Sequence, residues 1–546
     1  MPETLASLRS IGAVLAGIGK SGLLGPFTPA QTARVAADIA GGGRRALSVG
    51  AVYRLAAALD PSAAAVVDDA GAVGFADMDR QAGAVAAGLA DLGVGEGDAV
   101  ALLCRNHRGF LLSLVAAARL GADVVYLNTG FAAPQLAGVL GDERVAAVVA
   151  DEEFVALLEG GGVAVPVVVA WCEDPAAQAR PTIDGMVGDH GDHGGSGDHG
   201  GSGGSPVPAS RRASRHVLLT SGTTGRPKGA ARQVGGPLGL LPVVGVLARI
   251  PYRRGDVTVM AAPMFHAWGL ANTAVALGFG ATLVLPRRFD PEETLALVAR
   301  YRARVLVAVP VMLQRILELP ETTRRRYDTS SLRVIALSGS ALPGGLATRA
   351  LAEYGDVVHS LYGSTEAGWV SVAGPEDLRA DPATAGRPLP GVAVRIADPA
   401  GRRVPAGVRG RILVRSAIAV DGAGRGWLDT GDVGHLDSAG RLVVEGRADD
   451  MIVSGGENVY PVEVEELLAG HPGVADVAVV GVPDERFGQR LEAWVVRRPG
   501  HRVGAEELKQ LVRGRLARYK VPRRIHFVAR LPRTTTGKVL RRELGG

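Results

Sequence analysis

The strongest constraint on the fold is a regular alternation of short apolar runs and longer helical stretches that begins near Gly97. Strands are predicted in DAVALLCRN, DVVYLN and RVAAVVAD, with a helix in RGFLLSLVAAARLGA after the first strand. The same rhythm returns at DVTVMAAP, ATLVLP, RVLVAVP and LRVIALSG. Strands that alternate with helices indicate right-handed β-α-β units around a parallel sheet. We therefore expect an α/β fold whose large N-terminal domain consists of stacked αβ subdomains.

The chain, at 546 residues, is too long for one compact core, so at least one domain boundary is expected. A boundary is predicted near GRADDMIVSGG, which a strand-and-helix unit follows. We place a large domain at residues 1–447 and a small α+β domain at 448–546. Within the large domain, residues 184–205 read DGMVGDHGDHGGSGDHGGSGGS and predict a flexible Gly/His-rich insertion. Its histidines have no rigid frame that would fix a metal.

The distribution of charge and the number of cysteines limit the classes of binding partner that we expect. The net charge is only +5, but thirteen Lys or Arg residues fall between His501 and Gly546. Such a tail is either a solvated surface or a contact for ATP, coenzyme A or an acidic membrane face. No nucleic-acid module accompanies it, so nucleic acid is not an expected partner. Cys104 and Cys172 are too few for a disulfide framework, which fits a reducing, cytoplasmic setting.

The N-terminal stretch IGAVLAGIGKSGLLG is apolar but short, and Lys20 interrupts it. It is too short to span a bilayer and lacks the basic region of a signal peptide. An amphipathic segment in peripheral contact with a membrane stays open as an interpretation, and so does a homodimer.

The strongest chemical signal is the string HVLLTSGTTGRPKGA. A strand-like VLL runs into a turn of small and hydroxyl-bearing residues, and a lysine follows. Small residues let the backbone wrap closely around an anion, hydroxyls donate hydrogen bonds and the lysine adds positive charge, which together suit a phosphate. The spacing of a Walker loop is absent. The predicted phosphate-binding residues are Thr220, Ser221, Gly222, Thr223, Thr224, Gly225 and Lys228.

The string TSGTTGRPKG resembles the signature of the adenylate-forming superfamily, which includes acyl-CoA synthetases, peptide-synthetase adenylation domains and firefly-type luciferases. Further motifs arrive in the order of that family, and the resemblance runs from about Ala51 to Glu543. It implies a carboxylic acid as substrate and ATP, Mg²⁺ and coenzyme A as cofactors.

The resemblance implies a nucleotide site built from several later motifs. LYGSTEAG corresponds to a motif against the adenine and α-phosphate, and its Glu366 would hold Mg²⁺ together with Thr220, because a hard cation prefers oxygen ligands. Asp432 in WLDTGDVGHLD would accept hydrogen bonds from the ribose hydroxyls, and Arg447 would make a second ribose or phosphate contact. The residues assigned to this site are Gly339, Ser340, Ala341, Tyr362, Gly363, Ser364, Thr365, Glu366, Asp432 and Arg447, of which Thr365 and Glu366 are also assigned to catalysis.

The resemblance also implies that the C-terminal domain rotates between two half-reactions. Asp449 matches the hinge position, where one residue absorbs the dihedral change. Lys538 in LPRTTTGKVLRREL corresponds to the catalytic lysine that bridges the attacking carboxylate oxygen and the α-phosphate. The segment SGGENVYP would line the tunnel for the pantetheine arm of coenzyme A, with its glycines allowing a close approach. The residues assigned to that segment are Ser454, Gly455 and Gly456.

The string APMFHAWGL concerns the acid substrate. His266 follows Phe265, at the position where amino-acid-activating relatives carry an aspartate. A free amino acid would lose its charge partner in a partly desolvated pocket, which argues against peptide-synthetase chemistry. We assign His266 to catalysis at the substrate carboxylate, and a core histidine packed on Trp268 is the alternative. The aromatic residues also resemble the gate of long-chain acyl-CoA synthetases, and CRNHRGF resembles a bacterial fatty-acid ligase subgroup.

The sequence thus predicts an ATP-dependent acyl-CoA ligase, closest to bacterial fatty-acid–CoA ligases. It would activate a carboxylic acid, of medium or long aliphatic chain, as acyl-AMP and then form the coenzyme A thioester. Burial of an aliphatic chain stabilises binding by about 0.8 kcal/mol per methylene. Three alternatives stay open: an aryl-acid CoA ligase, an acyl-AMP ligase that loads a carrier protein, and a non-catalytic lipid- or nucleotide-binding relative. The intact Lys228, Glu366 and Lys538 argue against the last of these.

Overall fold

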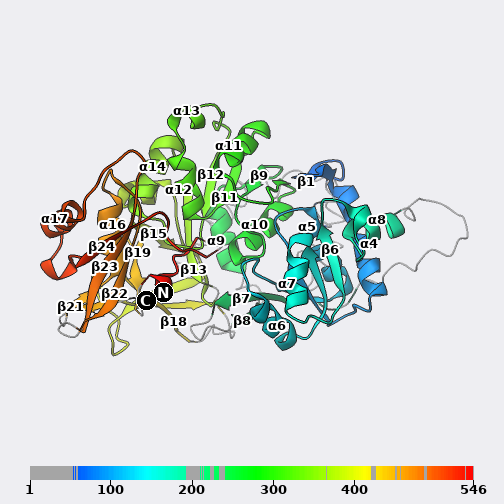
Figure 1. The fold of residues 1–546 in the computed structure, drawn as a ribbon, viewed down its shortest axis with the longest axis horizontal. Coiled ribbons are helices and arrows are strands. Elements are labelled where there is room, and N and C mark those ends of the chain that lie inside the picture. Colours follow the sequence, from blue (N-terminus) through cyan, green and yellow to red (C-terminus); the bar gives the residue numbers. More distant parts are fainter. Residues whose placement is uncertain are drawn as a thin grey trace, which may run out of the picture. The chain divides into compact units, whose positions relative to one another are not determined.

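The computed structural model describes Tyr53, Ala56 and residues 60–546, except for 192–209, 211, 213, 222–226, 233–239, 365, 420–425, 449, 451, 455–456, 485–487, 535–536 and 545–546. The chain forms two compact units (Figure 1). The first unit comprises Met1–Val234, Ile250–Ala308 and Leu319–Ile335, and the second comprises Gly235–Arg249, Val309–Glu318 and Ala336–Gly546. The predicted domain boundary between residues 447 and 448 falls inside the second unit and stays a prediction.

The first unit contains a six-stranded sheet with the strand order β6-β5-β3-β4-β7-β8. All neighbouring pairs are parallel except β7 and β8, which form an antiparallel hairpin. Its strands are β3 (Ala99–Leu103), β4 (Asp123–Tyr126), β5 (Val145–Asp151), β6 (Val167–Trp171), β7 (His216–Ser221) and β8 (Pro227–Arg232). The apolar runs predicted as strands after Gly97 are confirmed, and their Val, Ala and Leu side chains form one buried cluster.

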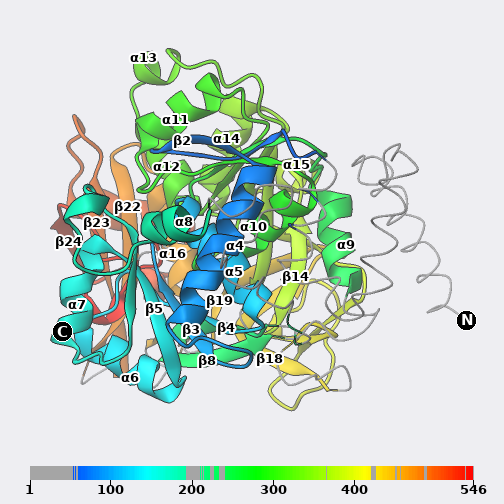
Figure 2. The same ribbon diagram turned by 90° about the vertical axis from the view of Figure 1, so that its right-hand side faces the viewer.

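Helices pack on this sheet and on one another. Figure 2 shows α4 (Phe75–Asp91) beside α5 (Arg108–Leu120), and α4 also packs against α8 (Ile183–Gly191). The approach of α8 is close, because a Cβ added at Gly88 would lie 2.5 Å from Cγ of Met186. The predicted loop over 184–205 is therefore wrong for its first residues, since burial of Ile183 and Met186 orders them as a helix. The remainder of the insertion lies outside the described residues. Two short helices, α6 (Ala133–Asp142) and α7 (Val155–Gly160), follow β4 and β5.

A second group of strands in the first unit has the order β2-β1-β10-β9-β11. The pairs β1–β10, β10–β9 and β9–β11 are parallel, as β-α-β connections require, whereas β1 and β2 form an antiparallel hairpin. The elements are β1 (Ala64–Asp68), β2 (Gly71–Gly74), β9 (Val257–Met260), α10 (Ala267–Gly278), β10 (Thr282–Val284), α11 (Pro291–Arg300), β11 (Val305–Ala308) and α13 (Glu321–Arg324). These strands confirm the later part of the predicted alternation. The last predicted strand is β12 (Val334–Leu337), within which the division between the units falls.

The second unit contains strands in the order β16-β17-β18-β19-β15-β14-β13, and each of these neighbouring pairs is antiparallel. The strands are β13 (Val358–Ser364), β14 (Gly368–Ala373), β15 (Thr384–Pro388), β16 (Val392–Ala397), β17 (Gly410–Ser416), β18 (Leu428–Leu436) and β19 (Leu442–Arg447). The helices are α9 (Leu240–Arg249), α12 (Pro310–Glu318), α14 (Gly344–Tyr354) and α15 (Pro375–Ala380).

The C-terminal part of the second unit has a sheet and a core of its own, as an α+β domain should. The sheet has the order β21-β20-β23-β22, and β24 pairs with β23. The elements are β20 (Ile452–Ser454), β21 (Glu457–Val459), α16 (Pro461–Ala469), β22 (Val474–Asp484), β23 (Gly488–Arg497), α17 (Ala505–Arg515) and β24 (Arg524–Val528). Helix α17 ends at Arg515, because Leu516 adopts an extended backbone and packs against this core.

None of the helices described here combines the length and the apolarity that a membrane crossing would need. The apolar N-terminal stretch lies outside the described residues.

Candidate active site

The predicted phosphate loop lies at the hairpin between β7 and β8. Strand β7 runs parallel to β4, and the antiparallel register sets Thr220 opposite Lys228 and Ser221 opposite Pro227. The two ends of the motif therefore meet across the hairpin, at the carboxyl end of a strand that pairs in parallel, where α/β sheets commonly bind ligands. The tip residues Gly222, Thr223, Thr224 and Gly225 lie outside the described residues.

In the second unit, three predicted nucleotide residues come together from three strands. The hydroxyl of Tyr362 on β13 donates to Oδ2 of Asp432 on β18, at 2.5 Å. Asp432 pairs in register with Arg447 on β19, whose Nη1 lies 3.7 Å from Oδ1 of Asp432. Gly431, next to Asp432, has φ +74°, a backbone conformation that favours glycine, and an added Cβ would lie 2.8 Å from Nη2 of Arg447, whose side chain would have to shift.

The surroundings of Tyr362 and Asp432 keep the phenol protonated and hold the Asp432 side chain in one orientation. Burial, followed by the charge of Asp432, raises the pKa of Tyr362 well above its ordinary value, so the phenol stays protonated and donates. The backbone N–H of Asp432 donates to Oγ1 of Thr430 at 3.1 Å, and that hydroxyl donates to the carbonyl of Ile412 at 3.0 Å. A carboxylate held in this way is suited to accept hydrogen bonds from vicinal hydroxyls such as those of a ribose.

The residue after β12 is hydrogen-bonded to the strand that carries Tyr362. Oγ of Ser338, at the end of β12, donates to the carbonyl of Leu361 at 2.9 Å, next to Tyr362. Only glycine fits at Gly363, where an added Cβ would lie 2.2 Å from the carbonyl oxygen of Gly368. The hydroxyl of Ser364 accepts from the N–H of Ala367 at 2.9 Å. Three residues assigned to the nucleotide site, Gly339, Ser340 and Ala341, follow Ser338, and Gly339 has φ +92°.

The predicted magnesium ligands are only partly described. Glu366 is exposed, so its carboxylate meets solvent, as a ligand for a hydrated hard cation should. Thr365 lies outside the described residues, and of Thr220 the structure gives only the backbone pairing.

The predicted acid-binding loop lies in the first unit, before α10. His266 is the N-terminal flanking residue of that helix, and its ring centroid is 4.4 Å from that of Phe265. Burial lowers the pKa of His266 to about 4, so the imidazole is neutral near pH 7. The alternative of a core histidine packed on Trp268 stays open, and the indole N–H of Trp268 itself donates to the carbonyl of Ala308 at 3.1 Å.

One residue that sequence reasoning missed holds this loop in place. The amide of Asn106 is buried; it donates to the carbonyls of Met260 and Ala262 at 2.9 and 3.0 Å and accepts from the N–H of Met264 at 2.9 Å. These bonds fix the backbone immediately before Phe265. The segment CRNHRGF marked the position only by its likeness to a subgroup. A buried asparagine directly after a strand was the available signal, but its partners lie far away in the sequence.

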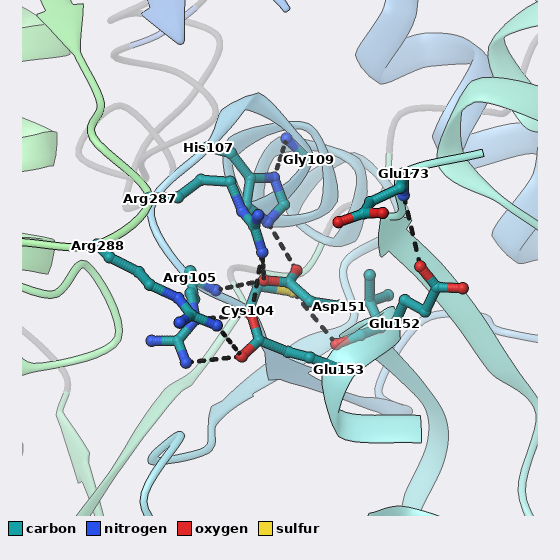
Figure 3. A network of polar contacts seen from close by, with 11 residues as sticks. Cys104, Arg105, His107, Gly109, Asp151, Glu152, Glu153, Glu173, Arg287 and Arg288 are labelled. Carbon is teal, nitrogen blue, oxygen red and sulfur yellow. Dashed lines mark hydrogen bonds and ion pairs between the residues drawn. The ribbon is translucent and has the colours of Figure 1, made fainter. Parts of the chain in front are cut away.

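Figure 3 shows how the residues on either side of Asn106 are anchored. The N–H of Arg105 donates to Oδ2 of Asp151 at 3.0 Å, and Nε2 of His107 lies 2.7 Å from Oδ1 of the same carboxylate. Arg287 approaches Asp151 at 3.8 Å. Asp151 thus holds the backbone and the side chain that flank Asn106, and it is itself fully buried. These contacts restrain the backbone on both sides of Asn106 and so help to orient its side-chain amide. We call residues 104–109 together with Asp151 the anchor.

The anchor also brings three potential metal-ligand atoms together. The donor atoms of Cys104, His107 and Asp151 lie within 4.8 Å of one another. However, Nδ1 of His107 accepts from the N–H of Gly109 at 3.1 Å, which places the imidazole proton on Nε2, facing Asp151. Burial raises the pKa of the Cys104 thiol, so it stays protonated, and the guanidinium of Arg287 adds positive charge. A donor on His107, a protonated thiol and a nearby guanidinium are consistent with a hydrogen-bonded structural cluster and do not favour binding of a metal cation.

Lys538 lies on a tight turn in the second unit, and its side chain is exposed. The N–H of Thr534 donates to the carbonyl of Lys538 at 2.8 Å, and the N–H of Lys538 donates to Oγ1 of Thr534 at 3.1 Å. Both backbone groups of Lys538 are therefore bonded to one residue across the turn. The position of the chain is fixed, while the ammonium group remains accessible.

The remaining predicted residues are at most partly described. Ser454 ends β20, and its backbone pairs with that of Glu457. The predicted hinge Asp449 and the tunnel residues Gly455 and Gly456 lie outside the described residues.

Comparison with known proteins gives a consistent set of matches. A model described as "AMP-binding enzyme" matches residues 53–422, and one described as "AMP-binding enzyme C-terminal domain" matches residues 463–538. A feruloyl-CoA synthase from Amycolatopsis sp is 35% identical, over 89% of this chain and 96% of its own. The fatty acid–[acyl-carrier-protein] ligase ScoC from Streptomyces coeruleorubidus is 32% identical, over 89% and 93%. The solved structure of the anthranilate CoA ligase AuaEII with anthranoyl-AMP is similar with a TM-score of 0.79 and 26% identity, over 91% of this chain and 96% of the other.

Proposed function

The chain belongs to the AMP-binding enzymes, the adenylate-forming family, and from this premise we propose that it is an ATP-dependent acid–CoA ligase acting on an aromatic carboxylic acid. CoA ligases of this family use ATP, Mg²⁺ and coenzyme A. The reaction joins the acid to AMP with release of pyrophosphate. The thiol of coenzyme A then displaces AMP from the acyl carbon.

The observation that carries the proposal is the group formed by Tyr362, Asp432 and Arg447. A carboxylate oriented by a partly buried phenol and paired with an arginine supplies acceptors for ribose hydroxyls and a cation for phosphate. The exposed carboxylate of Glu366 is a suitable ligand for Mg²⁺, which would offset the negative charge of the phosphates. Lys538 would stabilise the charge that forms as the carboxylate attacks the α-phosphate. On this proposal the small domain begins at residue 448 and turns about Asp449.

The nature of the acid is inferred from the loop before α10. The neutral imidazole of His266 beside Phe265 offers ring faces and a hydrogen-bonding nitrogen, but no negative charge for a substrate ammonium group. The similar feruloyl-CoA synthase and anthranilate CoA ligase are named for aromatic acids. Both observations favour an aromatic acid over the fatty acid that the sequence alone suggested.

A second candidate is an acyl-AMP ligase that transfers a fatty acid to the thiol of a carrier protein. It is favoured by the similarity to ScoC, whose name specifies a fatty acid and an acyl-carrier-protein. The adenylation residues would be the same, and only the acceptor and the acyl group would differ.

The test supplies ATP, Mg²⁺ and a panel of aromatic and aliphatic acids, with and without coenzyme A. We expect pyrophosphate release with aromatic acids and an acyl-CoA product when coenzyme A is present. Accumulation of acyl-AMP without a thioester would reject the coenzyme A assignment and favour the carrier-protein candidate. Higher kcat/KM for long-chain acids than for every aromatic acid would reject the aromatic assignment.

A further inference from the structure

The turn that carries Lys538 is bridged at its base by an arginine. Arg533 pairs with Val539 across the turn, and its Nη1 donates to the carbonyl of Gly537 at 2.5 Å. Gly537 directly precedes Lys538. Loss of the Arg533 side chain would therefore release the backbone next to Lys538, although the two side chains need not contact each other.

The same guanidinium also ties the turn to the C-terminal sheet. Nη2 of Arg533 donates to Oδ1 and Oδ2 of Asp476 on β22, at 2.8 and 2.7 Å. Their side chains are 24% and 23% exposed, so this pair is neither fully solvated nor fully buried. A planar guanidinium can bind a carboxylate and a carbonyl in fixed directions at once, which a lysine ammonium cannot reproduce.

Helix α12 supports the turn and the strand at neighbouring points. Nε2 of Gln314 donates to the carbonyl of Ala475, the residue before Asp476, at 2.8 Å. Gly537 has φ +81°, and a Cβ added there would lie 2.2 Å from Cγ1 of Val311. The turn is thus seated on α12 through Gly537 and tied to β22 through Arg533, and Gln314 links α12 to the start of β22.

From this geometry we propose that Arg533 and Asp476 are positioning residues for Lys538. They set where the ammonium group of Lys538 stands while the acyl-AMP bond forms, and they contact neither the acid nor the nucleotide. This proposal rests on the proposed function, because it assigns Lys538 to the adenylation step. It predicts that their loss affects adenylation and not the transfer from acyl-AMP to coenzyme A.

The test measures the two half-reactions separately in the full-length protein. Arg533→Ala should lower the rate of pyrophosphate release by on the order of 100-fold, the loss expected when a catalytic group is displaced by about 1 Å. Thioester formation from supplied acyl-AMP and coenzyme A should stay within about twofold of the unmodified protein. Arg533→Lys should recover part of the adenylation rate. The matched control is Arg530→Ala, which removes a positive charge from an exposed position in the same segment and should leave both rates unchanged.

A double variant separates positioning from general damage. Arg533→Ala combined with Lys538→Ala should be no slower in adenylation than Lys538→Ala alone, because Arg533 acts only through Lys538. If the losses multiply, Arg533 has a role of its own and the proposal is wrong. Equal losses in both half-reactions would also overturn it. If Arg533→Ala does not fold, Asp476→Asn is measured in its place, since it weakens the same pair while retaining an acceptor.

A measurement that needs no activity keeps the result distinct from the proposed function. Amide hydrogen exchange in the free protein should accelerate at Thr534, Gly537 and Lys538 in Arg533→Ala, with the core of β22 and β23 unchanged. Unchanged exchange at these residues would show that Arg533 does not hold the turn, whatever the substrate proves to be. Faster exchange in a protein that activates no acid would retain the positioning role and reject the ligase function.

Discussion

The loop before α10 and the turn of Lys538 hold their chemical groups in opposite ways. The loop is fixed by a buried, uncharged amide, that of Asn106, and it presents a neutral imidazole. The turn is fixed by a partly exposed ion pair between Arg533 and Asp476, and it presents a solvent-exposed ammonium group.

This difference matches what each region has to do under the proposed function. A buried amide whose bonds are broken leaves carbonyls unsatisfied, so the loop has a strong preference for one geometry. An ion pair that water reaches contributes less and is screened by salt, so it restrains the turn without making it costly to release. The acid side is therefore built as a permanent surface, and the lysine side as a restraint on a group that acts in one half-reaction.

The largest effect is expected for the exposed group itself. Lys538→Ala should reduce adenylation by on the order of 1000-fold, because the charge forming on the attacking oxygen and the phosphate loses its stabilising cation. Thioester formation from supplied acyl-AMP should be largely retained. Pyrophosphate release and acyl-CoA formation, followed separately, check this. Equal loss of both half-reactions would remove the distinction between the two regions.

The next effect concerns the buried amide. Asn106→Asp keeps the shape but cannot donate to the carbonyls of Met260 and Ala262, which then face a carboxylate. We expect kcat/KM for the acid to fall by roughly 10- to 100-fold with little change in the KM for ATP. The free energy of unfolding should fall by about 1–3 kcal/mol for each carbonyl left unsatisfied. Steady-state kinetics and urea unfolding measure both; a parallel change in both KM values would mean that Asn106 serves general stability alone.

A smaller effect should appear in the pH dependence of stability. Burial lowers the pKa of His216, His266 and His359 to about 4 in the folded chain. The unfolded chain binds these protons below about pH 6.5, so stability rises with pH between about 4 and 6.5 and is flat above. His266→Gln should reduce the slope by up to about 1.4 kcal/mol per pH unit. Urea unfolding between about pH 4.5 and about pH 7.5 tests this, because that range contains the unfolded-state histidine pKa of about 6.5. An unchanged slope would contradict a buried neutral His266.

The smallest effect is expected from salt. At about 1 M ionic strength the screening length is about 3 Å, so the pair of Arg533 and Asp476 should weaken. Adenylation should slow by about two- to threefold, which corresponds to a partly exposed ion pair. The slowing should be smaller in Arg533→Ala, while the KM for the acid should respond similarly in both proteins. Equal salt responses of the two adenylation rates would place the origin of the effect elsewhere.

Much of the fold could be predicted because its signals are local. The apolar runs of the first unit are buried strands that need no information from distant residues. The residues assigned to the nucleotide also rest on local signals, since Tyr362, Asp432 and Arg447 each occupy a short motif that resembles one of the family. Helix α8 was missed because its ordering depends on packing against α4, and the sequence around it is rich in glycine.

The residues that hold the site could not be predicted, for a physical reason. Asn106 bonds to Met260, and Arg533 bonds to Asp476, so each pair is separated by a long stretch of chain. Their chemistry is ordinary, and only the fold makes them partners. Short motifs indicate the groups proposed to contact the ligand. The groups that orient them can be identified only from tertiary contacts.

The anchor has a practical consequence for recombining this chain with its relatives. Within it, Arg105 and His107 both bond to Asp151. Asn106 bonds to the loop before α10, and Arg108 forms an ion pair of 2.5 Å with Asp68. A chimera that exchanged residues 260–266 alone would bring a foreign loop to an unchanged asparagine. Exchange of acid specificity should therefore succeed as a joint transfer of residues 104–109 and 260–266 with Asp68 and Asp151 retained or transferred with them, and a transfer that separates these partners should give poorly folded or indiscriminate hybrids.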